Sequence, residues 1–421
     1  MWPMYIIMAV IAIPAAFYLY RFLQRMFKTF GVKTEIKSVK VALCIASVCL
    51  SLICTNIFGI GAIIILHVLV TAFAFQFINF VIKKTAGDRY IQGFKLWKNI
   101  YESGVLPILI TVVLILYGYV NMNNVVLTDY TVYTEKEIRE EGYRVVLIAD
   151  VHFGVSLDAN ELKEKCDEIS SKNVDMVVLC GDIVDDNTSR EDTNIVFKVL
   201  SSIKSTYGTF YVYGNHDRQL YRTEREYTEA ELADIIEGNG ITILQDDTYT
   251  INDDFVIAGR EDNSYSRIKE RLSIEELLKD IDKNDFILTL DHQPKEYEQN
   301  SKAGTDLLLS GHTHGGQIWP AQYLFAIAKF DDAVYGHTQI NENTQAIVTS
   351  GLAGWGYPVK TASPAEYVII DIKKHHDRPF RSGKVNRCSQ NLQLLLPPRR
   401  SCLSDLRVHP HCRIPSPARP Q

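Results

Sequence analysis

The order of apolar and polar residues divides the chain into two unlike regions. Up to residue 121 the apolar residues form long runs, at residues 4–20, 41–58, 60–82 and 105–120. From residue 143 they form short runs that end at Gly, Asp or Asn and alternate with charged segments. Long apolar runs are typical of helices that cross a bilayer, which takes about 20 residues. The second pattern predicts an α/β domain.

We interpret residues 1–121 as a region of four transmembrane helices. The first run lacks a basic start and contains Pro14, so we expect a retained anchor and not a cleaved signal peptide. Cytoplasmic loops are enriched in Lys and Arg. Such residues gather in the loops after the first and third runs: Arg21, Arg25, Lys28, Lys33, Lys37 and Lys40, then Lys83, Lys84, Arg89, Lys95 and Lys98. An even number of spans places the rest of this multi-pass cell-membrane protein outside the cytoplasm.

We expect one α/β domain in residues 122–374. Its predicted strands are residues 143–149, 176–180, 210–213, 241–244, 255–258, 286–290, 307–309, 346–349 and 367–372. Its predicted helices are the charged segments between them, residues 159–172, 193–202, 228–238 and 273–283.

Composition adds two exclusions. The chain has 421 residues, of which 47% are hydrophobic and 22% charged, as in ordered proteins. A net charge of -6 provides no basic field that would attract a polyanion, so we expect no nucleic-acid partner. Of the eight cysteines only Cys166 and Cys180 fall in the α/β domain, so no disulfide framework is inferred.

Polar residues follow the ends of five predicted strands. Asp150 and His152 follow the first, and because successive side chains alternate in direction, both point to one side. The other strand ends carry Asp182, Asn215, His292, His312 and His314. In open α/β sheets such ends border the ligand crevice. Together these carboxylate, amide and imidazole groups indicate two divalent ions, Mn, Fe or Zn, because the donors outnumber the needs of one ion.

These residues resemble the ordered motif of the calcineurin-like metallophosphoesterases. The blocks stand as Asp150-Val151-His152, Gly181-Asp182, Gly214-Asn215-His216-Asp217, His292 and Gly311-His312-Thr313-His314. The resemblance implies a two-sheet αββα sandwich. It also implies that one metal is held by Asp150, His152 and His314, the other by Asn215, His292 and His312, with Asp182 bridging them. The continuation through Trp319 and the apolar runs look like the membrane-associated bacterial branch of the family.

The implied activity is metal-dependent hydrolysis of a phosphate ester, either a phosphomonoester or a phosphodiester. Lipid-linked esters are natural candidates, because an anchored site meets them at high local concentration. Two neighbouring cations lower the pKa of a shared water and clamp the phosphoryl oxygens, so that a metal-bound hydroxide attacks in line. We expect His216 to protonate the leaving oxygen or to stabilise the phosphate charge, with Asp217 holding its ring by a hydrogen bond.

Other interpretations stay open. A membrane sensor or binding protein could keep the fold without catalysis, although the complete ligand set favours an enzyme. A nuclease is disfavoured because the sequence has no basic stripe. Trp319, Trp355 and Tyr357 could line a cleft for a lipid or a base, although core packing explains them equally well. Arg218 and Lys360 could contact a substrate phosphate, but single basic residues usually lie on solvated faces. Asp185 and Asp186 could support the ligands or belong to a polar loop.

The composition changes sharply after Lys374, from Lys, Glu, Ile and Asp to Arg, Pro, Ser, His and Cys. Residues 375–421 show no periodicity and no recognisable metal-ligand spacing. We expect this tail to be disordered, or to be the product of a shifted reading frame, which the encoding DNA would reveal.

Overall fold

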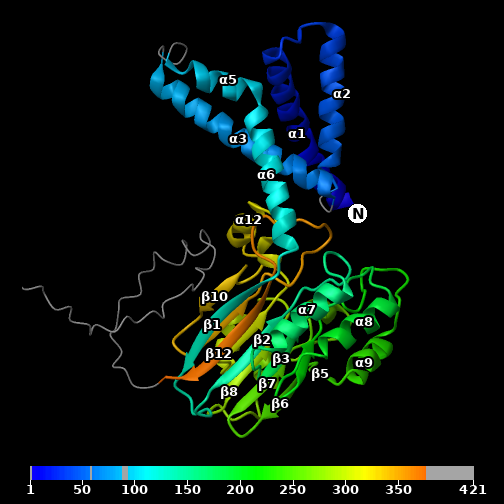
Figure 1. The fold of residues 1–421 in the computed structure, drawn as a ribbon, viewed down its shortest axis with the longest axis vertical. Coiled ribbons are helices and arrows are strands. Elements are labelled where there is room, and N and C mark those ends of the chain that lie inside the picture. Colours follow the sequence, from blue (N-terminus) through cyan, green and yellow to red (C-terminus); the bar gives the residue numbers. More distant parts are fainter. Residues whose placement is uncertain (1, 57–58, 88–92, 376–421) are drawn as a thin grey trace, which may run out of the picture. The chain divides into compact units, whose positions relative to one another are not determined.

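The computed structural model describes residues 2–56, 59–87 and 93–375. Its N-terminal part is helical (Figure 1), with α1 (Trp2–Thr29), α2 (Lys37–Ile53), α3 (Ile60–Ala86), α5 (Lys95–Ser103) and α6 (Val105–Met122). Helices occupy all four predicted runs, although residues 57–58, at the end of the second, lie outside the described residues. Among the described residues, α3 and α6 are long and apolar enough to cross a membrane. Length and composition thus support two spans.

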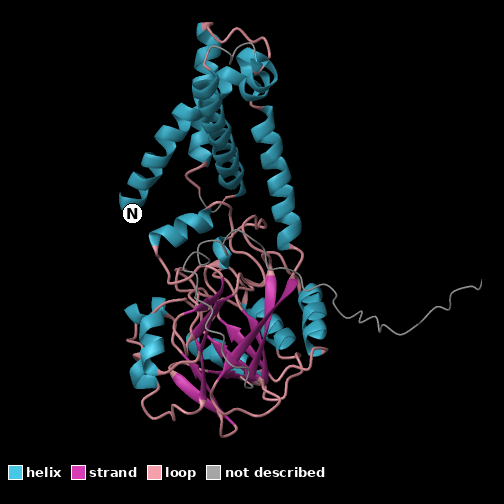
Figure 2. Ribbon diagram, turned by 90° about the vertical axis from the view of Figure 1, so that its left-hand side faces the viewer, coloured by secondary structure: helices cyan, strands magenta, loops and turns pink. Residues whose placement is uncertain are grey.

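Two mixed six-stranded sheets form the α/β domain (Figures 1 and 2). The first has the order β1-β12-β2-β3-β4-β5, with bounds Val126–Thr134, Glu366–Lys374, Tyr143–Ile148, Met176–Cys180, Thr209–Val212 and Ile241–Ile243. The second has the order β10-β11-β9-β8-β7-β6, with bounds Gly336–Gln339, Gln345–Val348, Leu307–Ser310, Phe286–Leu290, Phe255–Gly259 and Asp247–Ile251. Strands β2 to β5 are parallel, as are β7 to β9, so their carboxyl ends share one edge of each sheet.

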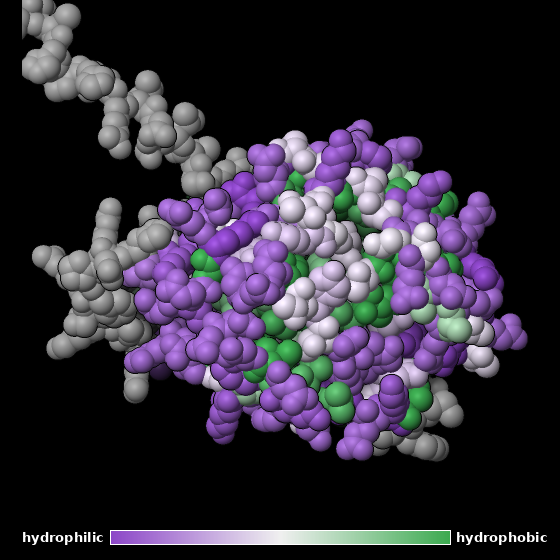
Figure 3. All heavy atoms as spheres, turned by 90° about the horizontal axis from the view of Figure 1, so that it is seen from below, coloured by the Kyte–Doolittle hydropathy of each residue, from purple (hydrophilic) through white to green (hydrophobic). Residues whose placement is uncertain are grey.

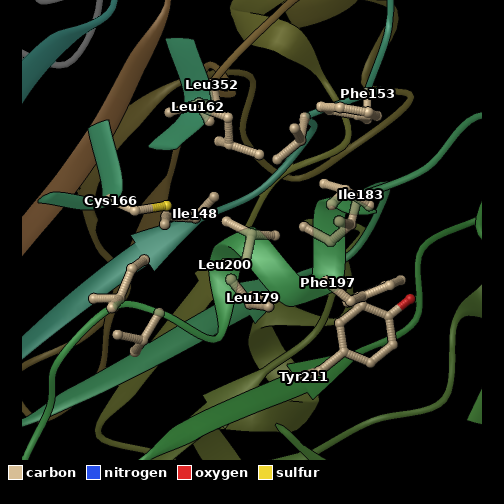
Figure 4. Close-up of a cluster of buried hydrophobic side chains, with 14 of the residues drawn as sticks. Ile148, Phe153, Leu162, Cys166, Leu179, Ile183, Phe197, Leu200, Tyr211 and Leu352 are labelled. Carbon is tan, nitrogen blue, oxygen red and sulfur yellow. The ribbon is translucent and has the colours of Figure 1, made fainter. Parts of the chain in front are cut away.

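The two sheets pack face to face around an apolar core. Val145 and Phe210 of the first sheet share this core with Phe255 and Leu288 of the second. The outer face of the first sheet is covered by α7 (Ala159–Ser170), α8 (Arg190–Leu200) and α9 (Glu229–Gly238), which bury a second cluster that Figure 4 shows in part. The outer face of the second sheet is covered by α10 (Ile274–Leu277) and α11 (Tyr297–Ala303). The layers have the predicted αββα order.

Helices begin at capping residues, and a prediction from the apolar pattern alone misplaces these helix starts. α8 begins at Arg190, three residues before the predicted start, because the Ser189 side chain accepts a hydrogen bond from the backbone N–H of Asp192. The predicted helix at residues 273–283 is shortened to α10. Strands β1, β6 and β10 were not predicted, because polar residues interrupt the apolar ones in these edge strands and no continuous apolar run marks them. Helices α5, α11 and α12 (Ala321–Ala328) were also missed.

The N-terminal helices hold one loop of the domain. Asn121 at the end of α6 donates through Nδ2 to the carbonyl oxygens of Lys360 and Ser363, at 2.8 and 2.7 Å. In α3 the buried His67 contacts Thr361 Oγ1 at 3.2 Å. This loop leads into β12, the last strand described. The predicted tail lies outside the described residues from residue 376 onward.

Candidate metal centre

The predicted ligands follow strands whose carboxyl ends meet. Asp150 and His152 follow β2, Asp182 follows β3, and the remaining ligands follow β4, β8 and β9: Asn215, His292, His312 and His314. All are buried except His312, which is partly exposed. The structure therefore brings every predicted ligand residue into one site.

The backbone is strained at most of these positions. Positive φ angles between 38° and 70° occur at Asp150, His152, Asp182, His312 and His314. Residues other than glycine seldom adopt this conformation, and it persists where the surrounding structure enforces it, often at functional sites. Gly311 allows the close approach of two ligand loops, because a Cβ there would lie 2.6 Å from Asp150 Oδ2. The strain turns the side chains toward a common centre.

One group of ligands consists of Asp150, His152 and His314. The Nε2 atoms of the two histidines lie 3.2 Å apart, and His314 Nε2 lies 3.8 Å from Asp150 Oδ1. Both Asp150 oxygens accept the backbone N–H of His312 at 3.0 Å, which fixes the carboxylate. Nitrogens bound to one tetrahedral ion at about 2.0–2.1 Å are separated by about 3.3 Å. This spacing suits two imidazoles that share one cation.

The second group lies around Asn215. Its Oδ1 is 2.8 Å from His312 Nδ1 and 3.2 Å from His292 Nε2. Asp182 lies next to both groups, because its Oδ2 is 3.2 Å from His292 Nε2 and 3.7 Å from His152 Nε2. A carboxylate in this position is able to bridge two ions.

Hydrogen bonds on the outer side of the imidazoles fix which nitrogen faces the centre. His152 Nδ1 lies 3.1 Å from Asp185 Oδ2, and His292 Nδ1 lies 2.8 Å from a backbone carbonyl oxygen. A carboxylate and a carbonyl only accept, so each Nδ1 carries the proton and each Nε2 directs a lone pair inward. There the lone pairs meet the Asp182 carboxylate. Cations bound between these acceptors would relieve the repulsion, and the donor set suits divalent metals.

The pKa shifts of the site also indicate that a positive charge is needed beside Asp182. Burial opposes the ionised form of Asp182, yet His292 beside it lowers the pKa of Asp182 well below its usual range. Burial likewise opposes protonation of His292, and Asp182 raises the pKa of His292 well above its usual range. Burial also raises the pKa of Asp150 to about 6 and lowers the pKa of His312 to about 3. A positive charge is thus required beside Asp182, as a proton or as a metal cation.

His216 lies at the rim of this centre. Its ring is 5.4 Å from the ring of His152, and its Nδ1 lies 2.5 Å from Asp186 Oδ2. The prediction that Asp217 holds this ring is wrong. The buried Asp217 carboxylate instead accepts four backbone N–H groups, those of Asp182, Ile183, Val184 and Gly214. Asp217 therefore fixes the ligand loops, and Asp186 positions His216.

Two acidic residues in the site were left undecided by the sequence. Asp185 and Asp186 follow the Gly181-Asp182 block by three and four residues, and each contacts one histidine of the site. The sequence feature that could have indicated their role is their position shortly after the end of a strand that carries a candidate ligand. The expectation of solvated faces is wrong for Arg218 and Lys360, because both are buried. Arg218 makes two hydrogen bonds to Glu261, at 2.8 and 3.0 Å, and Lys360 Nζ donates to backbone carbonyl oxygens.

Comparison with known proteins agrees with this geometry. Residues 143–316 match the family model of the calcineurin-like phosphoesterases, a range that extends from β2 past the last ligand. A metallophosphoesterase of Campylobacter jejuni is 29% identical over 262 residues, which cover 61% of this chain and 66% of that protein. A transmembrane protein with a metallophosphoesterase domain from Danio rerio is 28% identical over 288 residues, which cover 65% of this chain and 63% of that protein.

The matched segment spans from 62 to 66% of the length of the first four of these curated relatives. Among solved structures, a dimetal phosphatase from Danio rerio superposes with a TM-score of 0.37 at 14% identity. This alignment covers 55% of this chain and 93% of that one. A likeness of this size does not bear on function.

Proposed function

We propose, from the premise that this chain is a metallophosphoesterase with a calcineurin-like phosphoesterase domain, that the centre holds two divalent cations and hydrolyses a phosphate ester. One cation would be held by Asp150, His152 and His314, the other by Asn215, His292 and His312, with Asp182 shared. The observation that carries the proposal is the convergence of buried lone pairs on both sides of Asp182 Oδ2. Such a set of acceptors is stable around cations and costly without them.

When bound, two such cations lower the pKa of a coordinated water and neutralise the phosphoryl oxygens. The protein supplies the proton for the leaving group. Because His216 Nδ1 faces the Asp186 carboxylate, its Nε2 is the atom free to carry a proton toward the leaving oxygen. Burial opposes protonation of this ring, but Asp182 and the hydrogen bond with Asp186 raise the pKa of His216 to about 9. His216 is thereby prepared to act as an acid.

Trp355 forms the outer edge of the site beside His216. The two rings are 5.2 Å apart and tilted by 38°. Gln317 fixes this tryptophan by two bonds to its backbone: the amide oxygen accepts from Trp355 N at 2.9 Å, and Nε2 donates to Trp355 O at 3.0 Å. An aromatic ring next to the acid is positioned to contact the leaving group of the ester.

The membrane arrangement is also part of the proposal. We infer four spans, α1, α2, α3 and α6, that hold the domain on the extracytoplasmic side. The support is the apolar surface of the helices, where Val113 and Leu116 are exposed by 64% and 61%, together with the basic loops described above. A phosphate ester at that surface, including a lipid-linked one, is the substrate that such a protein would meet.

The test uses the full chain, purified in detergent. Hydrolysis of an aryl phosphate monoester and of a diester is measured with Mn²⁺ added or chelated, and bound metal is counted by mass spectrometry. We expect about two metal ions per chain and metal-dependent hydrolysis, both lost in Asp182→Asn and retained in Asp167→Asn, which changes an exposed helix carboxylate. Two bound ions without turnover of either ester would favour the sensor or binding function. A wild-type chain that binds no metal would refute the proposal.

A further inference from the structure

An apolar surface on the domain lies next to the metal centre. It is formed by α12 and the residue two positions after it, and it consists of Leu324, Phe325, Ile327 and Phe330, hereafter the α12 patch. The exposed fractions are 63%, 41%, 80% and 67%. On the inner side of the same helix, Gln322 is buried. Large apolar side chains gathered on one exposed helix face mark a site of contact with a protein or a membrane.

The membrane helices reach the segment that carries the α12 patch. Ile318, three residues before α12, packs with Ile63 of α3, and Ile115 of α6 lies against the same cluster. Gln317 and Ile318 also follow the last ligand, His314, after only two glycines. Figure 1 shows α12 at the level of the lower end of α6. The segment that leads into the α12 patch is therefore packed against α3 and α6 through a buried apolar cluster.

The level of the bilayer surface can be placed on α6. Tyr117 and Tyr119, in its last turns, are each 55% exposed, and tyrosine is enriched where membrane helices leave the hydrocarbon. Ile115 lies just before them, so Ile318 and the start of α12 meet the bilayer near its surface. Lys329, directly after α12, forms no ion pair with any residue that the structure describes, and the nearby Asp331 pairs with Lys295 at 3.7 Å. An unpaired cation there suits anionic headgroups.

The rim of the catalytic site continues onto this surface. Trp355 stands beside His216, and Tyr357, two residues on, packs against the cluster of Ile63 and Ile318. The segment from Trp355 to Tyr357 thus connects the rim of the candidate metal centre with the cluster that contains Ile63 of α3. By contrast, the face seen in Figure 3, viewed from below Figure 1, is mostly hydrophilic, with apolar residues scattered among polar ones.

We propose that the α12 patch is inserted into the membrane leaflet nearest the domain, and that the site takes phosphate esters whose acyl chains stay in that leaflet. A helix with one apolar face and a basic end lies in the interface plane in this way. The insertion rests on the exposed side chains of the α12 patch and on the packing of the segment before α12 against α3 and α6. The substrate class rests in addition on the proposed phosphoesterase activity.

Insertion is tested by photocrosslinking without any need for turnover. Benzoylphenylalanine replaces Ile327 in the full chain, which is reconstituted in vesicles of phosphatidylethanolamine and phosphatidylglycerol with alkyne-tagged acyl chains. The control places the same residue at Tyr133, which is 57% exposed and lies seven residues along β1, about 23 Å from its start. We expect tagged lipid on position 327 at roughly ten times the control yield. Equal yields, or a crosslinked dimer of the chain in place of lipid, would overturn the proposal; Leu324 provides a second labelling site.

The substrate class is tested with a Leu324→Ser, Ile327→Ser double variant beside a Tyr133→Ser, Tyr249→Ser control on exposed strand positions. In vesicles of the same lipids with phosphatidic acid added as substrate, hydrolysis of phosphatidic acid should show a KM raised roughly tenfold in the α12 variant only. The kcat/KM for a soluble aryl phosphate should be unchanged. An unchanged KM for phosphatidic acid would remove the proposed route to substrate. If neither protein hydrolysed any ester, the proposed activity would fail while the crosslinking result would still decide insertion.

Discussion

Substitution of Asp217 tests how this site is built. A role in bracing the loops predicts a loss of stability, whereas a role in orienting the His216 ring predicts a loss of turnover at unchanged stability. The side chain is fully buried, and each carboxylate oxygen accepts two backbone N–H groups. The donors belong to the turn at Asp182 and to Gly214, so one carboxylate joins the loops after β3 and β4. We expect Asp217→Asn to damage stability first and catalysis only as a consequence.

The magnitude follows from the hydrogen bonds. An amide in place of the carboxylate turns one acceptor into a donor and leaves two buried N–H groups without a partner, at about 1–3 kcal/mol each. The expected loss is therefore about 2–6 kcal/mol of unfolding free energy. For a domain of this size, about 4 kcal/mol corresponds to a decrease in Tm of roughly 8–16 °C.

The assay is thermal unfolding of the full chain in detergent, followed by near-ultraviolet circular dichroism. Chelator is present throughout, because metal binding would stabilise wild type and variant unequally. Asp186→Asn is the matched control, since this neighbouring carboxylate is only partly buried and contacts the His216 ring. If Asp217→Asn unfolded at the wild-type temperature and still lost turnover, the carboxylate would act on His216 in solution, and the structural role would be refuted.

Three further outcomes are expected. Asp186→Asn removes the carboxylate that faces His216 Nδ1, so the pKa of His216 should fall. Because an acid must be protonated to act, the alkaline limb of the pH profile of kcat should move to lower pH. An unmoved limb would exclude a catalytic role for this pair. Asn121→Ala removes two hydrogen bonds to the loop before β12 and should cost about 1–3 kcal/mol, seen as a lower Tm of the full chain; an unchanged Tm would mean that α6 does not brace this loop. A fluorescent protein that matures only in the cytoplasm, fused after Lys374 where β12 ends, should remain dark; a bright fusion would reverse the inferred orientation.

The sequence predicted the site better than its surroundings. Each candidate ligand follows a buried strand, and the end of a buried strand can be predicted from an apolar run followed by Gly, Asp or Asn. The distance between strands in space cannot be read in that way. It was the resemblance to a family with a known order of motifs that placed His292 near Asn215, 77 residues before it.

The role of Asp217 shows where such reading fails. The sequence places Asp217 next to His216, and adjacency suggested a hydrogen bond between their side chains. Neighbouring residues in a tight turn point in different directions, however, and here the turn directs Asp217 into the protein and His216 toward the rim. The real partner, Asp186, comes from the turn after another strand. Side-chain direction within loops is decided by tertiary structure, which an apolar pattern does not encode.

The buried side chains of Arg218 and Lys360 also show that tertiary contacts cannot be predicted from the apolar pattern. Arg218 and Lys360 read as surface residues because charged side chains seldom lie inside a protein unless they are paired. Arg218 is paired with Glu261, and Lys360 donates to a set of backbone carbonyl oxygens. No pattern in the sequence identifies these partners. The N-terminal helices differ, because length and hydropathy are local properties that the sequence shows directly. They suffice for α3 and α6, but α2 has only 17 residues.

The strained ligand backbone and the bracing around it belong to one design. Five ligands sit at positive φ, a conformation that costs about 1–3 kcal/mol per residue and that reverts unless other contacts hold it. Asp217 supplies such contacts for the turn at Asp182, and Ser363 Oγ supplies one by donating to the carbonyl oxygen of His314 at 2.8 Å. Ser363 is itself held by Asn121 of α6. One end of the candidate metal centre is therefore supported from inside the domain and the other from the N-terminal helices, so loss of either support should lower the unfolding temperature, and weaker metal binding should follow as a consequence.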